Sequence, residues 1–163
     1  MRKYQLPSFL EGVITQTHYQ RWLHRKAMAH VKRDRKRGNE GATNEAYKLA
    51  IHRAVEESQG KDAYTDEPLD WTLLSTYDND ESKTEKAEYK KRFALLPSVD
   101  HVGNQTGPTE FRICGWRTND AKSDLSYQEF VDLCKRVMDA DNHRLHLIAE
   151  KSRLQVSCML GDR

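Results

Sequence analysis

The segment Leu96–Lys122, LPSVDHVGNQTGPTEFRICGWRTNDAK, decides the fold that we predict for this chain. Within it, Ser98–Val102 is typical of a short strand, and the Gly, Asn and Pro residues of Gly103–Pro108 predict a loop. Phe111–Cys114 alternates apolar and polar side chains, which predicts a second short strand. Gly115–Lys122 then begins a helix or a tight turn. We therefore expect two short strands followed by a compact third element.

Two helical patterns precede this segment. Thr17–Lys36 predicts a helix with an irregular apolar stripe, and Asn44–Ser58 predicts a second helix. Gly60 stands just past the second helix, where a glycine commonly ends one. We expect the two helices to form a basic helical hairpin within residues 1–60.

The remaining sequence completes a mostly helical protein. We expect residues 61–126 to form its central part, with a polar segment at about 78–92 that is either a solvated helix or a surface insertion. Ser126–Glu129 matches a capping box, in which a serine and a glutamate satisfy N–H groups at the start of a helix. Residues 127–163 are therefore assigned to C-terminal helices. The predicted fold class is α+β, with one mostly helical domain.

Composition limits the classes of protein to which the chain can belong. Charged residues make up 32% of its 163 residues and the apolar set 37%, which is typical of a small domain with a thin core. No apolar stretch approaches the ~18 residues of a membrane span, and the N-terminus lacks a signal-peptide pattern. Three scattered cysteines (Cys114, Cys134 and Cys158) exclude a disulfide framework and favour reduced thiols. We expect a cytoplasmic protein with no membrane partner.

Positive charge is concentrated near the N-terminus, although the net charge of the chain is only +2. The run from His18 to Arg37 contains one acidic residue, Asp34, among eight basic ones: Arg21, Arg25, Lys26, Lys32, Arg33, Arg35, Lys36 and Arg37. Such a segment favours a surface that faces a polyanion such as nucleic acid. A solvated helix face is the alternative.

The central segment resembles the HNH nucleases, also called His-Me finger or ββα-metal nucleases. The resemblance depends on the pair Asp100-His101, on the strand that ends in Cys114, and on Asn119 followed three residues later by Lys122. With its flanks it covers about residues 63–126. It implies a ββα-metal finger inside the α+β domain.

The resemblance also implies a role for each residue of the motif. Asp100 and Asn119 would hold one Mg²⁺ or Mn²⁺ ion through oxygen atoms, the donors that Mg²⁺ prefers. His101 would act as the general base, because an imidazole can accept a proton from water near neutral pH. Lys122 would contact a phosphate or help to stabilise negative charge. Asp100 and His101 are expected on opposite sides of their strand, since side chains alternate.

The sequence departs from the family pattern in two places. The middle Asn of the motif falls here at Thr109 or Glu110, so that Thr109 or Asn104 would have to stabilise the loop. Many HNH proteins also bind a structural zinc ion through two CxxC pairs. Ala63–Asp66 and Cys114–Arg117 stand in their place, and only one cysteine remains. We therefore expect a finger without structural zinc, held together by packing.

The function implied is hydrolysis of phosphodiester bonds in DNA, most simply in double-stranded DNA, with Arg112 and Arg117 added to the basic residues that contact it. A homodimer would cut both strands, whereas a monomer would nick one. Two alternatives stay open: a nucleic-acid-binding protein that keeps the finger without catalysis, and an RNA-cleaving toxin or effector. His101 as a structural histidine and Asn119 as a helix N-cap are the corresponding alternatives for single residues.

Overall fold

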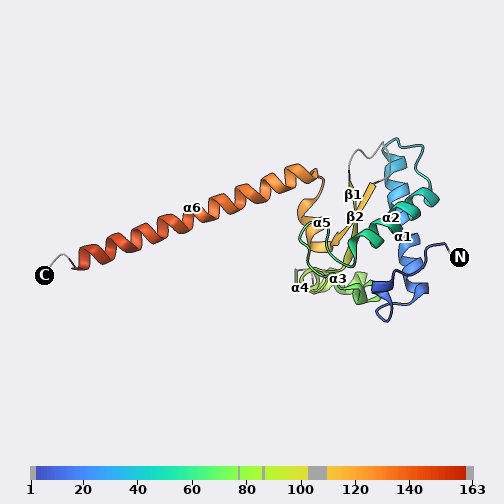
Figure 1. Cartoon of the computed structure of the whole chain (residues 1–163), viewed down its shortest axis with the longest axis horizontal. Coiled ribbons are helices and arrows are strands. Elements are labelled where there is room, and N and C mark those ends of the chain that lie inside the picture. The colour runs from blue at the N-terminus through green and yellow to red at the C-terminus, as the bar shows by residue number, and fades with distance from the viewer. Residues whose placement is uncertain (1–2, 77, 86, 103–109, 161–163) are drawn as a thin grey trace. The chain divides into compact units, whose positions relative to one another are not determined.

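The computed structural model describes residues 3–76, 78–85, 87–102 and 110–160, and within these ranges it leaves the side chains of residues 75, 79 and 150–160 undescribed. The chain divides into two compact units, residues 1–123 and residues 124–163. The first unit combines helices with a small sheet, so the predicted mostly helical α+β class is confirmed (Figure 1). Among the described residues, no helix has both the length and the apolar character needed to cross a membrane.

The sheet consists of two antiparallel strands, β1 (Pro97–Val102) and β2 (Glu110–Gly115). Their register pairs Asp100 with Arg112 and His101 with Phe111. Helix α5 (Trp116–Lys122) follows β2 directly, so the expected strand–strand–helix order is present. The connecting residues 103–109, which include the loop residues Asn104 and Thr109 of our prediction, lie outside the described part of the chain.

Two helices precede the sheet and cover one of its faces. Helix α1 (Gln16–Lys36) begins at Thr15, whose hydroxyl accepts a hydrogen bond from a backbone N–H of the first turn. Helix α2 (Asn44–Ser58) begins at Thr43 in the same way, and Gln59 and Gly60 end it with positive φ angles. A short 3-10 helix, η1 (Ser8–Leu10), precedes both.

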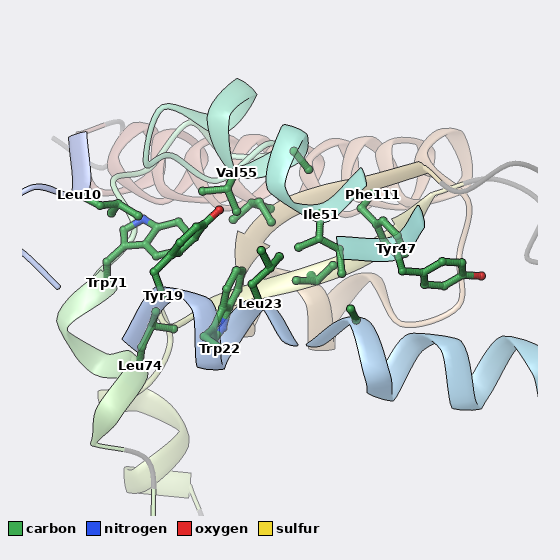
Figure 2. Packing of buried hydrophobic residues seen from close by; sticks show 14 of the residues in the cluster. Leu10, Tyr19, Trp22, Leu23, Tyr47, Ile51, Val55, Trp71, Leu74 and Phe111 are labelled. Carbon is green, nitrogen blue, oxygen red and sulfur yellow. The ribbon is translucent and has the colours of Figure 1, made fainter. Parts of the chain in front are cut away.

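The hydrophobic core lies where α1, α2 and the sheet meet. Figure 2 shows Tyr19, Trp22 and Leu23 of α1 facing Ile51 and Val55 of α2. The indole of Trp22 also packs edge-to-face on that of Trp71, at 5.6 Å between ring centroids. Trp22 and Trp71 are therefore buried core residues.

Between the core helices and the sheet, the chain forms three short helices. These are η2 (Trp71–Ser75), α3 (Asn79–Glu85) and α4 (Ala87–Arg92). The polar segment is thus two short helices, anchored by the fully buried Tyr89, whose ring stacks on Phe93 at 4.4 Å. This segment leads directly into β1.

The second unit contains helix α6 (Tyr127–Leu160), a single helix of 34 residues where we expected several. The predicted capping box is confirmed. The Glu129 N–H donates to Ser126 Oγ at 3.3 Å, and the Ser126 N–H donates to Glu129 Oε2 at 2.8 Å. These hydrogen bonds satisfy two N–H groups at the start of the helix.

Candidate active site

Asp100 lies on the face of β1 that α5 covers, in a buried ion pair. Its carboxylate oxygen Oδ2 is 3.2 Å from Nζ of Lys122, the last residue of α5, and both side chains are almost fully buried. The hydroxyl of Tyr64 donates a hydrogen bond to the same oxygen. No local pattern in the sequence indicates this bond between Tyr64 and a residue 36 positions away.

Asn119 lies on the same face of β1. Its amide nitrogen Nδ2 donates to Oγ of Ser98 at 3.0 Å, and Ser98 precedes Asp100 by two residues on the strand. Asn119 is the fourth residue of α5, and Gly115 occupies the N-cap position. The alternative in which Asn119 caps a helix N-terminus is therefore wrong for α5.

His101 lies on the opposite face of β1, towards α1 and α2. Its side chain is 5% exposed, and Nδ1 is 3.6 Å from Oδ2 of Asp34. The ring also contacts Phe111, with centroids 5.0 Å apart. Among the described residues, neither ring nitrogen has a hydrogen-bond partner. Burial lowers the pKa of His101 and the Asp34 carboxylate opposes that shift, so the imidazole is neutral at neutral pH.

Asp34 is the residue beside His101 that sequence reasoning missed. It is fully buried, and its Oδ2 accepts a hydrogen bond from the Tyr47 hydroxyl at 2.7 Å. We had treated it only as the one acidic residue of the basic run from His18 to Arg37. The spacing of residues along the helix could have indicated that Asp34 is buried. Asp34 follows Ala27 and His30 at helical spacing on the buried side of α1.

The structure places three of the four motif residues on one face of β1 and the fourth, His101, on the other face. Asp100 and Lys122 are in direct contact, and Asn119 lies on the same face of the sheet. His101 is across the strand, as the alternation of side chains predicts. Within the described part of the chain, no three side chains of His, Cys, Asp or Glu are grouped so that they could hold a metal ion.

A groove of about 900 Å³ lies between α1 and α5, beside the start of β1. Asn119 and Ser98 line it from the sheet side. Arg21, Arg25 and Lys26 line it from α1, and no acidic residue is among its lining residues. The groove thus connects part of the basic run with one of the two predicted metal ligands.

The other basic residues of our prediction lie elsewhere. Several have partners within the protein: Arg33 contacts the ring of His30, Arg35 donates to the carbonyl of Ala42, Arg112 lies over the ring of Tyr64, and Arg117 pairs with Glu67. Lys32, Lys36 and Arg37 are exposed on α1. The basic run is therefore spread around the helix, and only its first part faces the groove.

The buried carboxylate of Asp62 joins the segments Ala63–Asp66 and Cys114–Arg117, which occupy the positions where many HNH proteins have their zinc-binding CxxC pairs. One oxygen of Asp62 accepts the N–H of Tyr64 at 2.8 Å, and the other accepts the N–H of Gly115 at 2.7 Å. The N–H of Ala63 donates to the carbonyl of Ile113 at 2.9 Å. Burial raises the pKa of the Cys114 thiol, so this cysteine is a neutral core residue.

Comparisons of the chain with known protein families, with curated proteins and with solved structures find no match. A functional interpretation therefore depends on the geometry of β1, β2 and α5, and on the basic groove beside them.

Proposed function

We propose that this chain is a divalent-metal-dependent endonuclease of the HNH type, which hydrolyses phosphodiester bonds of DNA. One observation carries the proposal. Asn119 shares the α5 face of β1 with Asp100, and it also lines the groove that Arg21, Arg25 and Lys26 make basic. A phosphate backbone held by those cations would thus pass Asn119, one of the two proposed metal ligands.

The donor atoms fit Mg²⁺ or Mn²⁺. Asp100 offers a carboxylate oxygen and Asn119 a carboxamide oxygen, both of the hard type that these ions prefer. The buried Asp100 carboxylate also has a cation against it, the ammonium group of Lys122 at 3.2 Å. When bound, the ion would stabilise negative charge on the phosphate and on the leaving oxygen.

His101 has the chemistry of a general base. Its neutral ring can accept a proton from a water molecule, and the Asp34 carboxylate beside Nδ1 favours the protonated ring that results. His101 is the second-last residue of β1. In this role it needs a hydrogen bond to the attacking water in the substrate complex.

Lys122 and the groove cations would act on the phosphates. With a metal ion held by Asp100, the ammonium group of Lys122 would be available to a phosphate oxygen. Arg21, Arg25 and Lys26 would hold the backbone by a contact that does not depend on sequence and weakens as the salt concentration rises.

A plasmid assay tests the proposal. Purified protein with Mg²⁺ or Mn²⁺ is expected to relax or linearise supercoiled DNA, and EDTA should stop the reaction. His101→Ala and Asn119→Ala should each lower the rate by about 10²–10⁴-fold. His143→Ala, at an exposed position of α6, is the matched control and should cut like the wild type. Intact plasmid with both ions, or His101→Ala cutting at the wild-type rate, would contradict the proposal.

A nucleic-acid-binding protein without catalysis is the second candidate. The observation that favours it is the pairing of both key side chains inside the protein, Asp100 with Lys122 and His101 with Asp34. This candidate predicts DNA binding that is unaffected by EDTA, and no cleavage of DNA or RNA with either ion.

A further inference from the structure

We infer that the groove between α1 and α5 binds an unpaired segment of a polynucleotide strand, and that it does not accept a duplex. This inference rests on the proposed function and specifies its substrate. Duplex DNA, the substrate that the HNH resemblance implies, would then be engaged where one strand is unpaired, at a gap, a flap or a melted stretch.

The charge of the groove fits a single phosphate backbone. Arg21 and Arg25 are one helical turn apart, about 6 Å along the axis, so they can contact successive phosphates of one strand. Lys26 stands beside them, and within the described part of the chain no carboxylate pairs with any of the three. Burial lowers the pKa of Lys26, and the positive charge of Arg25 lowers it further.

The wall of the groove outside α1 is partly apolar. Leu96 and Trp116 are half-buried in it, beside the buried Leu74 and Pro97 and the polar Ser98 and Asn119. The bases of a duplex are stacked inside the helix and offer nothing to such a wall, whereas an unpaired strand exposes the faces of its bases. Proteins that bind single strands combine a positively charged groove with aromatic side chains on which the bases stack.

The size of the groove also favours one strand. Its volume of about 900 Å³ is near the upper end of the ~300–1,000 Å³ typical of ligand sites. A duplex cannot enter a hollow of this volume as a whole, so its paired bases do not reach the lining. Since Ser98 and Asn119 form part of the lining, a strand bound there runs along the α5 face of β1.

Fluorescence anisotropy with the full chain tests the inference. Labelled 12-nucleotide single-stranded DNA, single-stranded RNA and duplex DNA are titrated in EDTA, so that binding is measured without cleavage. We expect at least one single strand to bind 10-fold or more tightly than the duplex. The DNA and RNA arms identify the sugar that the groove prefers.

A double variant, Arg21→Gln with Arg25→Gln, tests whether the groove is the binding site. Loss of two phosphate contacts should reduce the slope of log K against log salt by about 1.4, since each contact on a single strand contributes about 0.7. Lys32→Gln with Lys36→Gln on the same helix, outside the groove, is the matched control and should change the slope less. Circular dichroism and the unfolding temperature check that both variants are folded.

Each outcome of these experiments either supports or overturns the binding of a single strand in the groove. Duplex binding as tight as single-strand binding, or equal slopes for the groove and control variants, would overturn the inference. Cleavage of plasmid together with equal slopes would leave the proposed function standing and remove only the inference. Groove-dependent binding of a single strand without any cleavage would support the inference and contradict the proposed function.

Discussion

Replacing Lys122 with methionine should leave the Asp100 carboxylate buried without a cation. In the wild type, Lys122 Nζ lies 3.2 Å from Asp100 Oδ2, and the two side chains are 5% and 7% exposed. Methionine keeps most of the volume of the lysine stem and removes its charge. The substitution therefore tests whether the buried Asp100 carboxylate needs a positive charge beside it. A carboxylate that needs a cation is what we expect of a metal ligand.

The magnitude follows from the burial of the pair. Removing one partner of a buried ion pair costs about 3–5 kcal/mol of unfolding free energy, because the other charge stays buried. Tyr64 still donates a hydrogen bond to the carboxylate, so we expect a loss near the lower end, about 3 kcal/mol. Adding Asp100→Asn to Lys122→Met removes the remaining charge and should recover at least about 1 kcal/mol.

The assay is urea unfolding in EDTA and in Mg²⁺. If Asp100 and Asn119 hold the ion, Mg²⁺ at 100 times its Kd should stabilise Lys122→Met by about 2.7 kcal/mol. It should not stabilise the double variant, which lacks the carboxylate. A loss below about 1 kcal/mol for Lys122→Met, or an equal effect of Mg²⁺ on both variants, would refute the reasoning.

Three further predictions concern the framework around the site. Burial lowers the pKa of His30 from 6.5 to about 3, so the unfolded chain takes up this proton first as the pH falls. The stability that depends on neutral His30 is therefore lost as the pH falls from 6.5 towards 3. Between pH 7.5 and pH 5, urea unfolding should show that His30→Phe loses about 2 kcal/mol less than the wild type, and an equal loss in the two proteins would contradict this. Asp62→Ala removes the acceptor for Gly115 and should lower the unfolding free energy by about 2–4 kcal/mol without rescue by zinc; a change below 0.5 kcal/mol would show that the carboxylate is dispensable. Gly115→Ala should cost about 1–3 kcal/mol in the same assay, because its Cβ would lie 2.9 Å from the carbonyl oxygen of Ala94, and a neutral result would mean that the backbone relaxes freely.

Local sequence signals were sufficient for the regular elements. Helix α2 begins and ends at Asn44 and Ser58 as predicted, since Thr43 caps its start and Gln59 and Gly60 take positive φ angles at its end. The capping box at Ser126 marks the start of α6 for the same reason. Each of these signals depends on residues within a few positions of the helix end.

The buried faces were harder to predict. On α1 the apolar Met28 is 49% exposed, while the polar His30 and Asp34 are buried. Hydrophobicity alone cannot indicate that a charged residue turns inward, because its partner comes from another part of the chain. For Asp34 that partner is Tyr47, on α2.

The candidate site was predictable in part. Alternation along β1 correctly separates Asp100 from His101, and the order of elements brings α5 onto the face of Asp100. The groove was not predictable, because a basic run of twenty residues winds around every side of a helix. Only the packing of α1 against the sheet decides that Arg21, Arg25 and Lys26 face Asn119.

Anomalous diffraction from a crystal soaked in Mn²⁺ tests the central claim most directly. Our account predicts a manganese peak within bonding distance of oxygen atoms of Asp100 and Asn119, with the Lys122 ammonium displaced from the carboxylate. A crystal that binds no manganese there, with the Asp100–Lys122 ion pair and the hydrogen bond between Asn119 and Ser98 both intact, would contradict the account.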